Sequence, residues 1–232
     1  MIVALDVPSL SRALAISRTL RGRVKMVKVG NQLFTAEGPS AVRELAKIIR
    51  GVFLDLKFHD IPNSVAGGVA SAAKLPGVRL LTLHATGGVT MMRAARAALR
   101  GVRNPPKLLA VTLLTSLDAR EMRRVGLAGS LQHRAVRLAR LAQESGMDGV
   151  VTSAHEARAI RRACGEDFII LVPGVRPSAT ARGDQTRIAT PAEAIRAGAN
   201  YIVVGRPITA ARDPRSAADS ILREIVVAHS RA

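Results

Sequence analysis

The sequence is poor in aromatic residues and in cysteine, and it has no long apolar run. Aromatic residues make up 2% of the 232 residues and tryptophan is absent, so Leu, Val, Ile and Ala must fill the core. The single cysteine, Cys164, excludes an internal disulfide framework. No apolar run approaches the roughly 20 residues that a transmembrane helix requires. These absences exclude a disulfide-rich secreted domain and predict that the membrane is not a partner.

The first residues also lack the features of a secretory signal. An apolar strand-like segment, IVALDV, begins at Ile2 and leaves no room for the charged start of a signal peptide. Together with the single cysteine, this predicts a cytoplasmic location.

Acidic residues are scarce, and the formal net charge is +18 with 29 arginines and six lysines. A positive field of this size favours anionic partners such as phosphorylated metabolites or nucleic acid. The arginines are spread over helix-like segments, however, with neither zinc-finger spacing nor basic residues interleaved with aromatic ones. We therefore expect a solvated, arginine-rich surface and no nucleic-acid partner, and we keep a basic nucleic-acid-binding protein as a distant alternative.

Short apolar segments rich in β-branched residues alternate with longer segments of helical periodicity along the whole chain. Their nearly continuous apolar character is typical of parallel strands that are covered on both faces. The eight segments that we expect to be strands are residues 2–7, 24–29, 52–57, 79–85, 108–114, 149–154, 168–174 and 201–206.

Eight strand–helix units without a linker predict an α/β protein that forms one (β/α)8 TIM barrel over residues 1–232, as a single domain. An open, doubly wound sheet is the competing architecture. It is disfavoured because no GxGxxG motif follows the first predicted strand and because eight is the number of units in the barrel.

Charged residues are concentrated at the end of the third predicted strand, in VFLDLKFHDIPNS (residues 52–64). Because side chains alternate along a strand, Asp55 and Lys57 face the barrel axis if Leu54 faces the helices. Catalytic groups of such barrels lie at the carboxyl ends of the strands. Asp60 follows the strand, and a lysine between two carboxylates stays protonated. Lys57 is therefore a candidate general acid.

Asp6 and Lys28 end neighbouring predicted strands and extend the series of alternating charges. A buried ion network that only closes the barrel is one interpretation, and a divalent metal held by Asp55 and Asp60 is another. Two lysines beside these carboxylates already neutralise them, which lowers the tendency to bind a metal. Since charged residues recur at adjacent strand ends, we favour a catalytic site that holds no metal.

A second group of candidate residues follows the seventh and eighth predicted strands, where barrels often bind phosphate. Gly205 allows a close approach of the backbone, and Arg206 offers two parallel donors to a phosphate group. Arg176 and Gln185 belong to a long polar loop that we expect to fold over an anionic ligand.

At this point the sequence resembles the orotidine 5′-phosphate decarboxylase family. The segment LDLKFHDIPNSV is similar to the family motif DLKxHDIPxTV, and other blocks of the family follow in the same order: IVALDV, VKVGNQLF, LHATGG, AVTLLTS, VPGVRP and IVVGRPIT. The resemblance implies removal of CO2 from orotidine 5′-monophosphate to give uridine 5′-monophosphate in de novo pyrimidine biosynthesis, with neither a metal nor an organic cofactor.

The resemblance also implies the roles of individual residues. Lys57 is expected to donate a proton to C6 of the pyrimidine, and Asp55 to lie beside the departing carboxylate. Asp6 and Lys28 are expected to hold the ribose hydroxyls. The other residues that the resemblance assigns to the substrate are Thr115 and Ser116 at the pyrimidine edge, and Arg176, Gln185, Gly205 and Arg206 at the phosphate.

A homodimer with shared active sites is a further implication of the resemblance. In this arrangement Asp60 and Ile61 reach the site of the partner subunit. Ser64 replaces the more common threonine of the motif and keeps its hydroxyl group, so it is retained as a substrate-binding candidate.

Magnesium-dependent sugar-phosphate decarboxylases and aldolases of the same superfamily are the main alternative. They share the Asp-x-Lys-x-x-Asp pattern, but their second strand typically ends in a glutamate that binds magnesium. Here Lys28 occupies that position in VKVG. A cation at this position favours the nucleotide enzyme.

Overall fold

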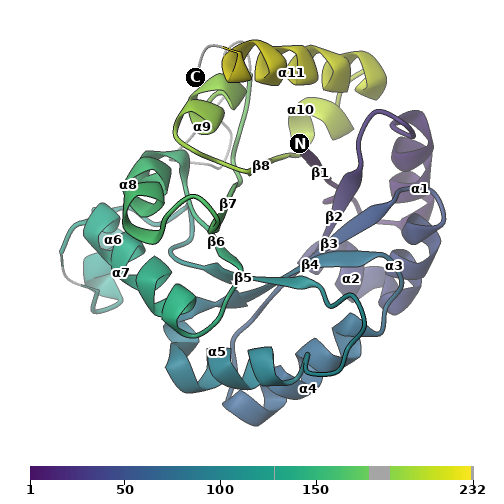
Figure 1. Ribbon diagram of the computed structural model, residues 1–232. Helices are drawn as coiled ribbons and strands as arrows, with labels where there is room; N and C mark the ends of the chain where they lie inside the picture. Colours follow the sequence, from purple (N-terminus) through teal and green to yellow (C-terminus); the bar gives the residue numbers. More distant parts are fainter. Residues whose placement is uncertain (128, 178–188, 231–232) are drawn as a thin grey trace.

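A closed barrel of eight parallel strands forms the centre of the molecule (Figure 1). The computed structural model describes residues 1–127, 129–177 and 189–230. Each strand pairs with its neighbours in sequence, and β8 closes the ring against β1. The strands are β1 (Ile2–Ala4), β2 (Met26–Gly30), β3 (Gly51–Phe58), β4 (Val78–His84), β5 (Lys107–Val111), β6 (Gly149–Val151), β7 (Ile169–Val172) and β8 (Tyr201–Val204).

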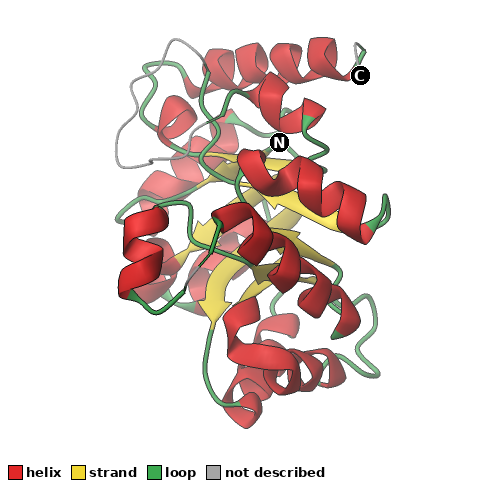
Figure 2. Cartoon of the chain, turned by 90° about the vertical axis from the view of Figure 1, so that its left-hand side faces the viewer, coloured by secondary structure: helices red, strands yellow, loops and turns green. Residues whose placement is uncertain are grey.

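Helices surround the barrel and cover the outer face of its strands (Figures 1 and 2). None of the helices in the described ranges has both the length and the apolar character needed to cross a membrane. The helices are α1 (Leu10–Thr19), α2 (Asn31–Glu37), α3 (Pro39–Ala46), α4 (Pro62–Ala73), the 3-10 turn η1 (Ala85–Gly87), α5 (Gly88–Ala97), α6 (Ala119–Arg124), α7 (Leu131–Glu144), α8 (Ala154–Cys164), α9 (Pro191–Arg196), α10 (Arg206–Thr209) and α11 (Pro214–His229).

The predicted TIM barrel is confirmed, and each predicted strand segment overlaps an observed strand. Several strands end earlier than expected: β1 ends at Ala4, and β5 ends at Val111. The chain still makes one further ladder contact beyond these ends, since the amides of Leu5 and Thr112 donate to carbonyls of the next strand. After that contact the chain leaves the ladder, and the residues that follow are free to line a cavity.

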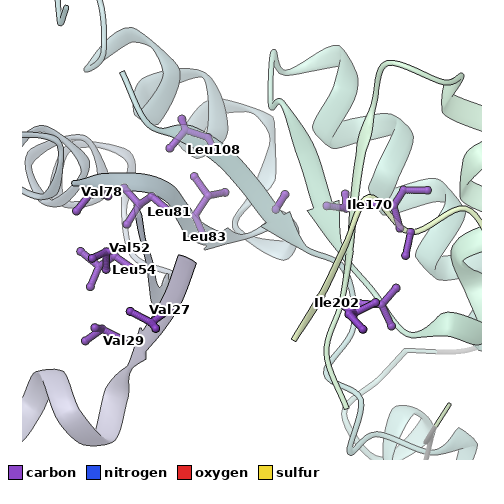
Figure 3. Packing of buried hydrophobic residues seen from close by; sticks show 14 of the residues in the cluster. Val27, Val29, Val52, Leu54, Val78, Leu81, Leu83, Leu108, Ile170 and Ile202 are labelled. Carbon is purple, nitrogen blue, oxygen red and sulfur yellow. The ribbon is translucent and has the colours of Figure 1, made fainter. Parts of the chain in front are cut away.

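Apolar side chains form two separate layers, as strand alternation requires. The outer layer lies between strands and helices, and Figure 3 shows part of it, including Leu54, Leu81 and Ile202. The inner layer fills the barrel itself and consists of Ile2, Ala4, Phe53, Leu80, Leu109, Val111, Val151, Leu171 and Val203. Because Phe53 is inward and Leu54 is outward, Asp55 is inward again at the end of β3.

Polar caps fix where several helices begin. Ser130 caps α7 by accepting a hydrogen bond from the amide of His133, and Asp213 caps α11 in the same way. Thr190 and Glu193 form a reciprocal capping box at α9. These caps satisfy backbone amides in the first turns of the three helices and so fix where each helix begins.

Candidate active site

A cavity of about 600 Å3 opens at the carboxyl ends of the strands. Its floor is apolar and is made by inner-layer residues such as Phe53, Val151 and Leu171. Among the described residues, its walls carry charged and polar groups that lie near the carboxyl end of every strand except β4, either within the strand or after it. These polar residues are Asp6, Lys28, Gln32, Asp55, Lys57, Thr115, Ser116, Thr152, Arg176, Arg206 and Thr209.

Four charged side chains form one continuous series across β1, β2 and β3. Lys28 Nζ lies 2.8 Å from Asp6 Oδ1 and 3.5 Å from Asp55 Oδ2. Lys57 Nζ lies 2.8 Å from the same Asp55 oxygen. The alternating charges that we expected from the sequence are therefore in contact, in the order Asp6, Lys28, Asp55 and Lys57.

Asp55 is the most buried carboxylate of this series, with 7% of its surface exposed. Burial alone would raise the pKa of its carboxyl group. The positive charges of Lys57 and Lys28, with hydrogen bonds from Lys57 and Thr82, outweigh that effect and hold the pKa below its ordinary value. Asp55 is therefore a buried anion between two ammonium groups.

The backbone of β3 is irregular where it carries Lys57. Lys57 has a φ of 51°, in the left-handed region that side-chain-bearing residues rarely adopt. Its amide donates a hydrogen bond to Thr82 Oγ1 at 3.0 Å. The same hydroxyl donates to Asp55 Oδ1 at 2.9 Å. Thr82 thus contacts both catalytic candidates, although it does not line the cavity.

The contact between Asp6 and Lys28 requires a residue without a side chain at position 30, which is Gly30. A Cβ atom at this position would lie 2.7 Å from Lys28 Nζ and 3.0 Å from Asp6 Oδ1. A side chain here would force both charged groups to move. The glycine in VKVGN therefore makes room for an ion pair, and its backbone has an ordinary negative φ.

The comparisons with known proteins agree on one family. Residues 1–221 match the Orotidine 5'-phosphate decarboxylase / HUMPS family. The chain belongs to this family. It is 51% identical over 231 residues to the orotidine 5'-phosphate decarboxylase of Moorella thermoacetica, covering 97% of this chain and 91% of that protein. It is 52% identical over 229 residues to that of Trichlorobacter lovleyi, covering 97% and 95%.

Solved structures are similar over the same length. The crystal structure of orotidine 5'-phosphate decarboxylase from Lactobacillus acidophilus has 38% sequence identity and a TM-score of 0.83, and it covers 97% of this chain and 98% of that chain. A protein from Geobacillus kaustophilus has 37% identity, a TM-score of 0.83 and coverage of 97% and 99%.

Most of the candidate residues that belong to the family motifs lie in the wall of the cavity. Thr115 and Ser116 follow β5, Arg176 follows β7, and Gly205 and Arg206 follow β8. They share one cavity with the four charged residues of β1, β2 and β3. Gln185, which we expected at a phosphate group, lies outside the described residues.

Three residues of the family motif point elsewhere. Asp60, Ile61 and Ser64 are exposed and do not line the cavity of their own chain. Asp60 Oδ1 accepts a hydrogen bond from the amide of Ile61 at 2.6 Å, just before Pro62 opens α4. We had expected Lys57 to lie between Asp55 and Asp60. Among the described ion pairs, the lysine with two carboxylate neighbours is Lys28.

His59 and His84 stack on one another near the site, with ring centroids 5.2 Å apart. Burial, followed by the electrostatic effects of His59 and Lys57, lowers the pKa of His84 to about 4. His84 is therefore neutral at physiological pH. Across residues 1–127, 129–177 and 189–230, no group of three or more His, Cys, Asp or Glu side chains is arranged to hold a metal ion.

Sequence reasoning missed Gln32, Thr152 and Thr209, which line the cavity, and Thr82, which contacts Asp55. Thr82 had a detectable signal, because it is a polar residue two positions after the inward-facing Leu80, within the apolar stretch LLTL of β4. Gln32 and Thr209 lie in the first turn of α2 and at the end of α10. Their position at the cavity depends on how the loops turn, which no periodicity in the sequence indicates.

We predict that Gly30→Ala lowers the free energy of unfolding by about 1–3 kcal/mol, because its methyl group displaces the partly buried Lys28 ammonium from Asp6. Gly67→Ala is the matched control. Gly67 lies within α4 with open space around its Cβ position, so alanine is expected to stabilise by about 0.5–1 kcal/mol. Urea unfolding of both variants measures the difference. A Gly30→Ala protein as stable as the wild type would contradict the steric role.

Proposed function

We propose that the protein is an orotidine 5′-phosphate decarboxylase, a carboxy-lyase that converts orotidine 5′-monophosphate to uridine 5′-monophosphate and CO2 in de novo pyrimidine biosynthesis. The observation that carries the proposal is the contact series Asp6, Lys28, Asp55 and Lys57 at the carboxyl end of the barrel. It is supported by relatives with that activity in their names, at about half identity over nearly the whole chain.

The pyrimidine ring offers no electron sink for the electron pair left on C6. The reaction therefore requires a proton donor. When the bond from C6 to the carboxylate breaks, CO2 leaves and the electron pair remains on C6. Lys57 Nζ then supplies a proton to C6 and recovers one from solvent. A fixed ammonium group in a poorly hydrated cavity stabilises the negative charge that develops on carbon. Lys57 is held for this role by its 2.8 Å contact with Asp55.

Asp55 contributes by its negative charge. In the proposed complex the substrate carboxylate lies beside Asp55, and their repulsion relaxes as the carboxylate becomes neutral CO2. Because Lys28 and Lys57 hold Asp55 in its charged form, this repulsion is present from the start. The apolar floor at Val151 and Leu171 excludes water from the reacting groups.

Binding of the distant parts of the substrate offsets the cost of that repulsion. We assign the ribose hydroxyls to Asp6 and Lys28, and the pyrimidine edge to Thr115 and Ser116. The phosphate is assigned to Arg176, Gln185, Gly205 and Arg206. The overall charge of +18 also attracts an anionic nucleotide.

We propose that the active enzyme is a homodimer in which Asp60 and Ile61 complete the site of the partner subunit, with Ser64 nearby. The support is their exposure: 67% of the Ile61 surface is accessible, beside a carboxylate that faces away from its own cavity. A two-fold interface places equivalent residues of both subunits at both sites. Nucleic acid is not a proposed partner.

We place the enzyme in the cytoplasm. Its single cysteine is buried, and a reducing compartment suits a chain that makes no internal disulfide.

Lys28 distinguishes the proposal from a magnesium-dependent sugar-phosphate enzyme, because its ammonium group contacts both Asp6 and Asp55. We expect the rate of decarboxylation of orotidine monophosphate to be the same with and without EDTA. The rate is measured as the loss of ultraviolet absorbance of the substrate. Turnover that EDTA abolishes and magnesium restores would favour the alternative. If the nucleotide is not turned over under either condition, the proposed function is wrong.

We predict that Lys57→Ala lowers kcat by at least about 10³-fold, because it removes both the proton donor and the ammonium charge. Lys25→Ala is the control, since Lys25 is exposed just before β2, at the opposite end of the barrel. Steady-state kinetics with circular dichroism spectra of both variants provide the measurement. Wild-type kcat in a folded Lys57→Ala enzyme would exclude Lys57 as the donor.

If the two subunits share their active sites, two inactive variants should recover activity when they are combined in one dimer. A dimer of one Lys57→Ala and one Asp60→Ala subunit has one site with both residues intact. After unfolding and refolding an equal mixture, we expect about a quarter of the wild-type activity. Each variant refolded alone serves as the control. If the mixture stays as inactive as its components, Asp60 does not act across an interface.

A further inference from the structure

Thr82 lies opposite the irregular part of β3, on the neighbouring strand β4. The register pairs Leu54 with Leu81 and Phe58 with Leu83. Between these pairs, β3 has the three residues Asp55 to Lys57, whereas β4 has Thr82 alone. The extra residues form a bulge, which re-aims side chains at the end of a strand. Both Asp55 and Lys57 line the cavity.

A single hydroxyl group bridges the two ends of this bulge. Thr82 Oγ1 accepts from the Lys57 amide at 3.0 Å and donates to Asp55 Oδ1 at 2.9 Å. The directions are fixed, because an amide is only a donor and an ionised carboxylate is only an acceptor. The Thr82 hydroxyl group therefore donates one hydrogen bond to the Asp55 carboxylate and accepts another from the Lys57 amide.

The bond to Asp55 decides how the carboxylate is oriented. Thr82 holds Oδ1, and the other oxygen, Oδ2, is left for Lys57 at 2.8 Å and Lys28 at 3.5 Å. Thr82 has no exposed surface, and it pairs across the sheet with Leu109 of the inner apolar layer. Without the hydroxyl, Oδ1 would face apolar surroundings and the carboxylate would rotate or shift.

The bond to the Lys57 amide supports an unfavourable backbone conformation. A φ of 51° is rarely adopted by a residue with a side chain, and such residues persist where surrounding contacts hold them. The position of Lys57 Nζ depends on this backbone. Thr82 consequently controls the donor through its main chain and Asp55 through its side chain.

We propose that Thr82 is a positioning residue for the decarboxylation, whose hydroxyl group sets the relative placement of the Asp55 carboxylate and the Lys57 ammonium. This inference rests on the proposed function. Thr82 does not line the cavity, so it acts through these two residues and not on the substrate itself. Loss of its hydroxyl should slow the chemical step and leave nucleotide binding, which uses other residues, nearly unchanged.

The test compares Thr82→Val, Thr82→Ala and Thr82→Ser. Valine keeps the shape and loses the hydroxyl, alanine loses both, and serine keeps the hydroxyl. We expect kcat to fall about 10- to 100-fold in the valine and alanine variants, and to remain close to that of the wild type in the serine variant. KM for orotidine monophosphate and the calorimetric affinity for uridine monophosphate should change little.

Thr112→Val is the matched control. Thr112 is equally buried at the end of β5, and its hydroxyl donates to the carbonyl of Val151 at 3.1 Å, away from the charged series. Its kcat should equal that of the wild type. A kcat that follows side-chain volume, with serine as slow as alanine, would overturn the proposal. So would equal losses in Thr82→Val and Thr112→Val. If the valine variant does not fold, the comparison of alanine with serine still decides.

A measurement without substrate separates this inference from the proposed function. Hydrogen exchange at the Lys57 amide, followed by NMR, should be slow in the wild type and in Thr82→Ser and faster in Thr82→Ala. Equal exchange rates in all three would overturn the positioning role, even if decarboxylation is observed. A wild-type enzyme that does not turn over orotidine monophosphate would instead overturn the proposed function.

Discussion

The ion pairs around Asp55 are the interaction on which the site depends. A buried carboxylate is costly unless it is paired and hydrogen-bonded. Here Lys57 and Lys28 contact one of its oxygens and Thr82 donates to the other. The barrel provides these partners from three adjacent strands, β2, β3 and β4, whose order in the ring equals their order in the sequence. The series of charged contacts is therefore a direct product of the strand order.

Separation of the two apolar layers explains how so many charges are tolerated at one end of the barrel. The outer layer between strands and helices holds most of the buried apolar residues. The inner layer is small, with nine buried members, and it forms the floor of the cavity. Stability therefore comes mainly from the outer layer, and the carboxyl ends of the strands are left for polar groups. With few aromatic residues available, Phe53 is the large residue of that floor.

The fold and the inward direction of Asp55 could be predicted because both follow from periodicity. Eight apolar segments predicted eight strands, and the outward Leu54 fixed Asp55 on the opposite face. The conformation of Lys57 could not be predicted in this way, because a bulge interrupts the alternation and nothing in the local sequence indicates a positive φ. Asp60 shows a second limit. It is three residues from Lys57 in sequence, yet the turn before Pro62 directs it away from the cavity.

The pairing of β1 with β8 has a consequence for how the protein is made. Ile2 and Val203 are partners in the ladder, so β1 is closed by β8, which is synthesised after the other seven strands of the barrel. Asp6 follows β1, and Arg206 follows β8. A chain still in synthesis therefore contains the Asp6 side of the cavity long before it contains the Arg206 side. The complete cavity therefore arises only when the ring closes, and a ligand that contacts both sides of it would hold β1 and β8 together.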